Sequence, residues 1–199
     1  MRTADLPETT VRAHRAPALQ PTPHLILGPY YPVQQPGRAG GTLWRGGLAD
    51  NRRTACPVEL SGTVFDSSGA AMAGVLIEAW QADELGRYRH PSAPEPAPDD
   101  AGCNGYAALR TDSDGAYSFR TLKPGAYGSA ERRRAPHVHF QVTGTHDRLV
   151  TQMFFPNEPL NAHDHWYRAT RRPEQLVASI IDDGTDVLRL RWDIVLCAG

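Results

Sequence analysis

The stretch that decides the fold is Arg134-Ala135-Pro136-His137-Val138-His139-Phe140-Gln141. Its apolar, β-branched and aromatic residues alternate with polar ones, which predicts a β-strand. Side chains along a strand point alternately to its two faces, so one face would carry His137, His139 and Gln141 and the other Val138, Phe140 and Val142. Two imidazoles aimed into the same space are either half of a metal site or a pair of structural histidines, and the rest of the chain must decide between them.

Composition narrows the possible partners. The chain has 199 residues, of which 40% are hydrophobic and 22% charged, enough for one sizeable core. A formal net charge of -1 offers no basic excess for nucleic acid, so a small-molecule partner is expected. No stretch approaches the roughly 20 apolar residues of a membrane span and the first residues lack an apolar signal core, which favours a cytoplasmic protein without membrane contact.

Three cysteines, Cys56, Cys103 and Cys197, are an odd number at wide spacing without a C-x-x-C pair. Neither a disulfide framework nor a zinc cluster is therefore expected, and each cysteine is interpreted as a small buried or loop residue.

Short alternating segments separated by Asp, Ser and Gly turns predict most of the secondary structure. Strands are expected within residues 58–65, 74–81, 111–121, 136–143, 149–155 and 186–196. Residues 172–182, with Pro173 near their start and apolar residues at helical spacing, are expected to form a helix. The pattern favours a mainly β protein, an antiparallel β-sandwich with long active-site loops and one or two short helices.

Turn signals also mark Asp112-Ser113-Asp114-Gly115. The segment lacks the later ligand positions of an EF-hand, so a hairpin turn is favoured over a calcium loop.

The N-terminal part differs in composition from the rest. Residues 1–57 are expected to form an extended arm and connection, and residues 58–199 the folded domain. The arm is expected to be loosely held up to about residue 25, and residues 37–57 to run over the surface. Between them lies Gly28-Pro29-Tyr30-Tyr31-Pro32, a rigid extended segment whose tyrosines could line a pocket or pack as ordinary core.

Two long irregular segments each carry a tyrosine, Tyr88 in the first and Tyr127 in the second, and long loops on a sandwich are where sites are usually built. The order of motifs is specific: Trp80-Gln81-Ala82-Asp83, Gly86-Arg87-Tyr88-Arg89-His90, Thr111-Asp112-Ser113-Asp114-Gly115, Lys123-Pro124-Gly125-Ala126-Tyr127 and His137-Val138-His139-Phe140. From about residue 58 to 196 the chain resembles the intradiol ring-cleaving dioxygenase family, most closely its protocatechuate 3,4-dioxygenase branch.

The resemblance implies a non-haem Fe(III) site with Tyr88, Tyr127, His137 and His139 as ligands. Ferric iron is a hard, highly charged ion that two anionic phenolates suit well. A free tyrosine has a pKa near 10, so the metal charge must drive its ionisation. The implied reaction is cleavage of a catechol ring by O2 between its two oxygenated carbons, giving a cis,cis-muconate-type diacid.

Further roles are carried over from the same resemblance. Tyr127 would leave the metal and accept a proton, while Arg134 and Gln152 would orient the substrate and stabilise developing charge. Tyr30 and Tyr31 are candidates for the substrate pocket. The resemblance also implies a homo-oligomer or pairing with a paralogous chain, with this chain as the iron-bearing partner.

Several alternatives stay open at the level of sequence. Gly128-Ser129 replaces the Pro-Trp usual in protocatechuate enzymes, so a catechol or hydroxyquinol substrate competes with a protocatechuate-like one. A transthyretin-like binding module without catalysis would explain the Gly-rich strand motifs, but not the two tyrosines and two histidines together. The second His-x-His, His163 and His165, lies in a polar stretch and is expected on the surface.

Overall fold

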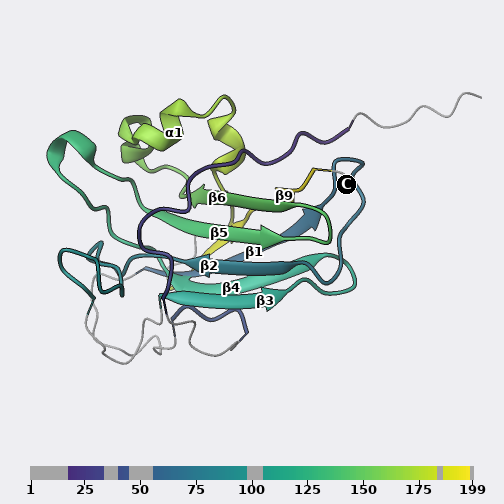
Figure 1. Cartoon of the computed structure of the whole chain (residues 1–199), viewed down its shortest axis with the longest axis horizontal. Helices are drawn as coiled ribbons and strands as arrows, with labels where there is room; N and C mark the ends of the chain where they lie inside the picture. Colours follow the sequence, from purple (N-terminus) through teal and green to yellow (C-terminus); the bar gives the residue numbers. More distant parts are fainter. Residues whose placement is uncertain (1–17, 34–39, 45–55, 98–104, 183–185, 198–199) are drawn as a thin grey trace, which may run out of the picture.

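A computed structural model describes residues 18–33, 40–44, 56–97, 105–182 and 186–197. Two β-sheets form the body of this structure, which confirms the predicted mainly β class (Figure 1). The elements are β1 (Pro57–Phe65), β2 (Leu76–Trp80), β3 (Tyr106–Arg110), β4 (Ala116–Leu122), η1 (Ala130–Arg132), β5 (His137–Thr143), β6 (Arg148–Phe154), η2 (Pro159–His163), α1 (His165–Ala169), η3 (Pro173–Leu176), β7 (Ser179–Asp182), β8 (Leu188–Arg191) and β9 (Ile194–Val195).

The four-stranded sheet has the order β3-β2-β5-β6, with antiparallel neighbours throughout. In this register His139 lies opposite Trp80 of β2 and opposite Gln152 of β6. The second sheet has the order β4-β1-β8-β7, and β1 pairs in parallel with β8 and β9. The second sheet is therefore mixed rather than purely antiparallel.

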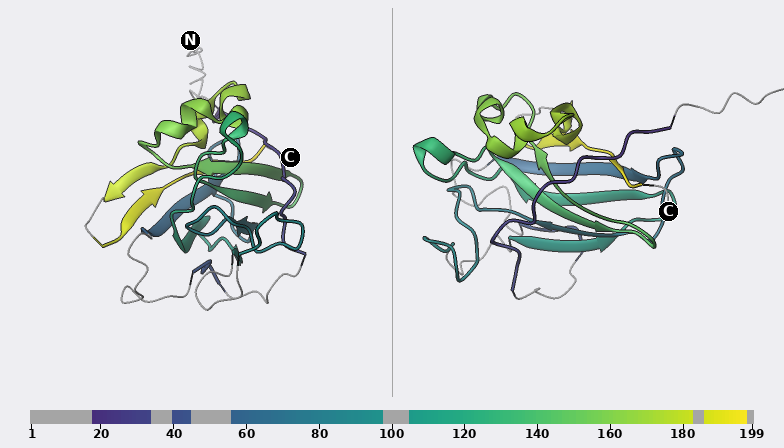
Figure 2. Two further views of the ribbon diagram at one scale, coloured as in Figure 1. Left: turned by 90° about the vertical axis from the view of Figure 1, so that its left-hand side faces the viewer. Right: turned by 45° about the horizontal axis from the view of Figure 1, so that its top comes forward.

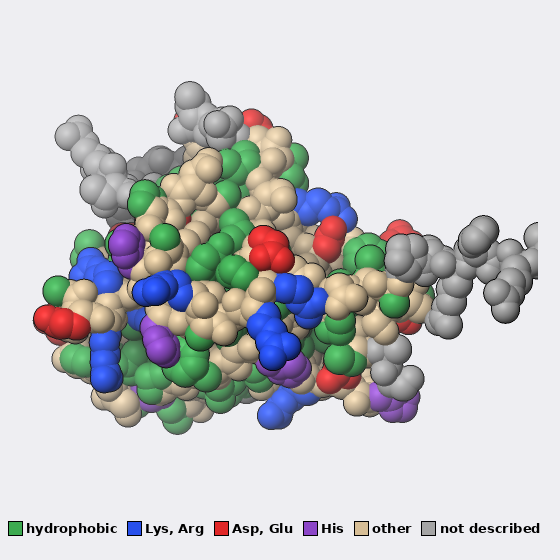
Figure 3. Space-filling model, turned by 90° about the horizontal axis from the view of Figure 1, so that it is seen from above, with side chains coloured by type: hydrophobic (Ala, Val, Ile, Leu, Met, Phe, Trp, Pro, Cys, Tyr) green, Lys and Arg blue, Asp and Glu red, His purple; other side chains and the backbone are tan. Residues whose placement is uncertain are grey.

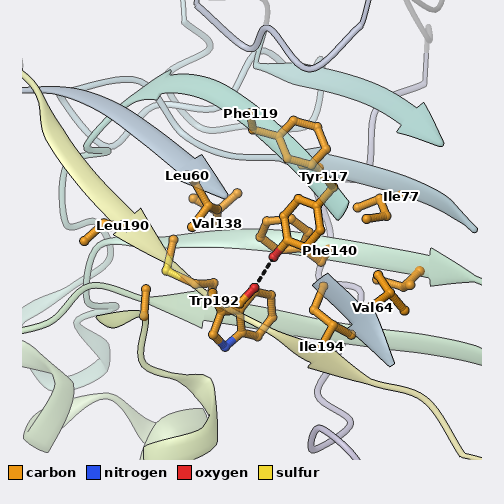
Figure 4. Close-up of a cluster of buried hydrophobic side chains, with 14 of the residues drawn as sticks. Leu60, Val64, Ile77, Tyr117, Phe119, Val138, Phe140, Leu190, Trp192 and Ile194 are labelled. Atoms are coloured by element: carbon orange, nitrogen blue, oxygen red, sulfur yellow. Dashed lines mark hydrogen bonds between the residues drawn. The ribbon is translucent and has the colours of Figure 1, made fainter. Parts of the chain in front are cut away.

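The core between the sheets uses the apolar face of β5 predicted from the alternation. Val138 and Phe140 are buried there with Leu60 of β1 and Phe119 of β4 (Figure 4). The hydroxyl of Tyr117 donates a hydrogen bond to the carbonyl of Trp192, so the one polar group that this ring brings into the core has a partner. The opposite face of β5 is thereby left free to present His137 and His139 to the loops.

Residues 18–33 of the predicted arm lie across the outer face of the four-stranded sheet, as the dark purple trace in Figure 1 shows. Backbone hydrogen bonds join Leu25 to Val150 and Thr22 to Val195, and Thr22 is 4% exposed. The prediction of a loosely held segment is therefore wrong for residues 18–25, because main-chain pairing with two strands fixes it. Residues 1–17 lie outside the described part.

The predicted surface connection is also partly wrong. Leu43 is fully buried in the main core, and its backbone N–H bonds to Arg120 of β4. The described residues 40–44 thus add a short piece of chain to the edge of a sheet, while the remainder of the connection up to residue 55 lies outside the described residues.

The helix expected over residues 172–182 is wrong. Pro173–Leu176 forms one 3-10 turn, and Ser179–Asp182 forms the edge strand β7, paired with β8. Ile180 and Ile181 are β-branched and favour a strand once a partner strand is available. One short α-helix, α1, is found instead at His165–Ala169.

Three further predictions concern the turn at Asp112, the cysteines and the absence of a membrane span. The segment at Asp112 forms a tight turn in which its carboxylate accepts two backbone N–H groups, but it joins strands of different sheets and is not a hairpin. Cys56 and Cys197 are free and exposed, and Cys103 lies outside the described residues. No helix in the described ranges has the length and apolar character needed to cross a bilayer.

Candidate metal centre

The two histidines lie at the start of β5, and the irregular loops gather at one end of the two sheets (Figure 2, left). The Nε2 atoms of His137 and His139 are 3.1 Å apart, and both residues are buried. The Nδ1 of His137 lies 2.6 Å from the Ala135 carbonyl, which fixes the proton on Nδ1 and leaves the Nε2 lone pair facing His139. This is the arrangement of two imidazoles that could share one metal ion.

Two loops bring the tyrosines to these histidines. The Asp83 carboxylate accepts hydrogen bonds from the backbone N–H groups of Leu85 and Arg87, which folds the first loop tightly. Gly86 has φ +80°, and a Cβ there would lie 2.7 Å from the Ala126 carbonyl, so the first loop can contact the second only because this residue is glycine.

The four rings form a closed set of contacts. Centroid distances are 5.3 Å from Tyr88 to Tyr127, 5.7 Å from Tyr127 to His137, 4.8 Å from His137 to His139, and 6.1 Å from His139 back to Tyr88. The structure thus brings together all four residues predicted from the sequence. Among the described residues no group of three or more His, Cys, Asp or Glu could hold a metal ion, so an ion here would need the tyrosines.

Burial controls the protonation of the cluster. It raises the pKa of Tyr88 well above 10, helped by the neighbouring Tyr127, and it also raises the pKa of Tyr127. Burial and the charge of Arg134 lower the pKa of His137 to about 3, and burial with the neighbouring His137 lowers the pKa of His139 well below 6.5. Without a cation all four groups are therefore neutral near pH 7.

Two buried polar atoms of the cluster lack partners. The hydroxyl of Tyr88 and the Nδ1 of His139 have no hydrogen bond within the described structure. Such atoms are costly in a protein interior unless something else engages them. A cation at this point would engage the Tyr88 oxygen, so the donor set fits a metal ion.

Arg134 and Gln152 lie beside the four rings. The Nη1 of Arg134 is 3.3 Å from the Tyr127 hydroxyl, and its Nη2 donates to Gln152 Oε1 at 2.6 Å. The Gln152 amide in turn donates to the carbonyl of Ile26 in the N-terminal segment. A fixed positive charge and an amide therefore border the cluster.

The two tyrosines of the N-terminal segment have different surroundings. The Tyr30 ring packs on Tyr88 at 4.8 Å and lies 5.7 Å from the His90 ring. Tyr31 turns away, with its hydroxyl bonded to Glu78 and its ring edge against Trp80. Tyr30 therefore lies against the cluster, whereas Tyr31 anchors the segment to the sheet.

Two residues of this region were missed by the sequence reasoning. Asp164 is fully buried and bonds to Arg134, although it stands in the polar stretch expected on the surface. Trp80 stacks on His139, although it was noted only as part of a motif. The flanking His163 and His165 are exposed, as predicted.

Comparisons with known proteins identify the family of this chain. A family model described as Dioxygenase matches residues 26–198. The chain is 33% identical over 178 residues to the protocatechuate 3,4-dioxygenase beta chain of Burkholderia cepacia, covering 84% of this chain and 76% of that one. It is also 33% identical to catechol 1,2-dioxygenase 1 of Acinetobacter lwoffii, over 86% of this chain and 58% of that protein.

Solved structures of dioxygenases have the same fold as this chain. The dioxygenase domain of a carbohydrate-binding fusion protein from Streptomyces sp. SirexAA-E superposes with a TM-score of 0.67 at 26% identity, covering 90% of this chain and all of that one. Catechol 1,2-dioxygenase of Pseudomonas arvilla C-1 gives a TM-score of 0.68 at 25% identity, with 89% and 62% covered. This chain belongs to the intradiol ring-cleaving dioxygenase family, which is a family of enzymes, and it spans little more than half the length of the catechol 1,2-dioxygenases that it matches.

Proposed function

We propose that this chain cleaves a catechol-type ring between its two hydroxylated carbons with O2, giving a cis,cis-muconate-type diacid, and that Tyr88, Tyr127, His137 and His139 hold a ferric ion for this reaction. The observation that carries the proposal is the closed set of contacts among two phenols and two imidazoles in one buried cluster. Such a donor set suits Fe(III) better than zinc or magnesium.

A ferric ion held by these four residues would supply Lewis-acid chemistry, which favours the ionised forms of the phenols and of the catechol. Of the two tyrosines, Tyr127 would be the one available to accept a proton from a substrate hydroxyl, because its hydroxyl contacts Arg134 and it is less buried than Tyr88.

Arg134 and Gln152 act on the substrate side of the cluster. The Arg134 guanidinium can stabilise negative charge that develops on the ring, since it is held within 3.3 Å of the Tyr127 oxygen. Gln152 is held between Arg134 and the Ile26 carbonyl, so its amide cannot rotate freely. Both groups are therefore fixed before the substrate arrives.

A protocatechuate-like substrate is the favoured choice. Arg132 and Arg133 are exposed just before Arg134, and Figure 3 shows Lys and Arg side chains over much of the face drawn, including its left-hand end. Positive charge at the entrance attracts an anionic ring substituent. Catechol and hydroxyquinol are the alternatives, because relatives of 29–33% identity carry those names and because Gly128-Ser129 leaves the wall open.

The same proposal covers the organisation of the chain. Residues 58–199 would form the catalytic sandwich, and the N-terminal segment would close the pocket with Tyr30.

The match to a protocatechuate dioxygenase beta chain supports pairing with a second chain type, and a homo-oligomer is the alternative. Light scattering of the protein alone and with a paralogous chain separates the two. A cytoplasmic location stays a prediction.

The function is tested with protein produced in iron-replete cells. We expect about one iron per chain, a broad visible band from tyrosinate-to-Fe(III) charge transfer, and O2 consumption matched by muconate absorbance with protocatechuate, catechol or hydroxyquinol. The ratio of kcat/KM among the three substrates decides the substituent. Colourless, iron-free protein that cleaves none of them would overturn the proposal and favour a binding module of the same fold.

A further inference from the structure

Asp164 is a fully buried carboxylate to which no role has yet been given. Its Oδ1 accepts the backbone N–H groups of Trp166 at 3.0 Å and Tyr167 at 3.2 Å, which caps α1. Its Oδ2 accepts from Arg134 Nε at 2.9 Å and from the backbone N–H of Ala135 at 3.0 Å. Oδ1 thus caps α1, and Oδ2 accepts hydrogen bonds from the residues that precede β5.

The contact with Arg134 fixes a whole guanidinium. Because that group is planar, holding Nε in place also sets the directions of its two NH2 groups. These are the groups that reach Tyr127 at 3.3 Å and Gln152 at 2.6 Å. The Arg134 side chain is 13% exposed and Asp164 is not exposed at all, so water competes little with this ion pair.

The contact with Ala135 fixes one of the histidines. The Ala135 N–H donates to Asp164, and the Ala135 carbonyl accepts from His137 Nδ1 at 2.6 Å. A single residue therefore links the carboxylate to the imidazole ring. Such indirect partners commonly set the orientation and basicity of metal-binding histidines.

We infer that Asp164 is a positioning residue, which aligns Arg134 toward the Tyr127 oxygen and holds the His137 imidazole through Ala135. The inference rests on the proposed function. A residue needed only to cap α1 would use one oxygen, whereas here the second oxygen carries two contacts to the segment that enters β5. Its loss should therefore alter the site while α1 keeps its cap.

The test variant is Asp164→Asn. The Asn oxygen can still cap α1, but the amide NH2 that replaces Oδ2 cannot accept from Arg134 or Ala135. The matched control is Glu158→Gln: Glu158 caps η2 through the Leu160 N–H and pairs with Lys123 at 2.9 Å, but contacts none of the site residues named above. Both variants lose one ion pair and keep a helix cap.

We expect Asp164→Asn to retain bound iron, to shift the tyrosinate band, and to lower kcat by about 10–100-fold with a smaller change in KM. Glu158→Gln should keep the band and kcat of the parent. An active parent together with an Asp164→Asn variant of unchanged band and kcat would overturn this inference alone. A parent without iron and without ring cleavage would overturn the proposed function and this inference with it.

The Asp164→Asn variant leaves the Arg134 charge unpaired and could fail to fold for that reason alone. A double-mutant cycle with Arg134→Gln provides a second test. Arg134→Gln removes that charge, and adding Asp164→Asn to it should lower kcat by a smaller factor than in the parent, because only the contact with Ala135 is left to lose. Fully additive losses in the cycle would mean that Asp164 does not act through Arg134, and would contradict the inference.

Discussion

The indole of Trp80 lies nearly parallel to the imidazole of His139, with ring centroids 4.9 Å apart and an interplanar angle of 12°. His137 is oriented by a hydrogen bond to Ala135, but the Nδ1 of His139 has no such partner in the described structure. Stacking on Trp80 therefore orients His139, the residue proposed above as a metal ligand, in place of the hydrogen bond that usually orients such a histidine.

Trp80→Phe should consequently loosen the metal site. The smaller ring covers less of His139, so we expect iron to be lost to a chelator about 10-fold faster, followed as decay of the visible band. Trp192→Phe is the matched control, because Trp192 packs on Phe140 in the main core. It should lower the free energy of unfolding by about 1–3 kcal/mol and leave the rate of iron loss unchanged.

Tyrosine-to-phenylalanine variants should separate ligands from core residues. Tyr127→Phe should retain some iron, with a weaker visible band and slow turnover, while His137→Ala should lose the metal. Tyr117→Phe removes a buried hydroxyl that bonds to Trp192, so it should cost about 1–3 kcal/mol of stability and keep the colour. If Tyr127→Phe and His137→Ala both bind iron and turn over normally, the ligand assignment is wrong.

Gly28 offers a test of the N-terminal segment. It has φ +78°, and a Cβ there would lie 3.1 Å from Cε1 of His139. Gly74 has φ +73° with nothing within 4 Å of an added Cβ. Each Gly→Ala variant should lose about 1–2 kcal/mol from the backbone alone. Gly28→Ala should in addition weaken iron binding, measured by titration of the metal-free protein, and Gly74→Ala should not.

The metal-free protein should lose stability as the pH falls. His137 binds its proton with a pKa of about 3 when folded, against about 6.5 when unfolded, so between these values the unfolded state holds more protons. The free energy of unfolding should therefore decrease below pH 6.5, by up to about 1.4 kcal/mol per pH unit for each such group, and level off near pH 3. Urea titrations at pH 7.5 and 5 measure this loss.

Replacing His137 by Gln should reduce that loss, and replacing the exposed His163 by Gln should not change it. Equal pH dependence in the parent and in His137→Gln would show that other groups govern acid stability.

The sequence predicted the parts of this fold that depend on local pattern. The alternation around His137 correctly predicted the strand, its apolar face and the opposite face that carries His137 and His139, because a buried face enforces a period of two. Residues 172–182 were mispredicted because apolar residues at positions 176 and 180 satisfy a helical spacing, while the true structure depends on pairing with β8. β3 was missed, since Tyr-Ala-Ala-Leu-Arg has little alternation of its own.

In the site, too, residues in local motifs could be predicted, and residues placed by long-range contacts could not. Tyr88, Tyr127 and the histidine pair could be found because each stands in a recognisable motif. Asp164 could not, because its link to Arg134 joins two positions 30 residues apart, and an Asp between two histidines reads as polar surface. An Asp preceding a short helix does signal a cap, but not which second group the carboxylate accepts.

The hydrogen bonds between Thr22 and Val195 bear on how the protein matures. They join positions 173 residues apart, so the segment around Thr22 cannot dock in this way until the chain has been synthesised as far as Val195. That segment brings Gly28 next to His139 and Tyr30 against Tyr88. The pocket is thus completed by the slowest kind of contact to form, and iron acquisition should be a late, post-translational event rather than a nucleus for folding.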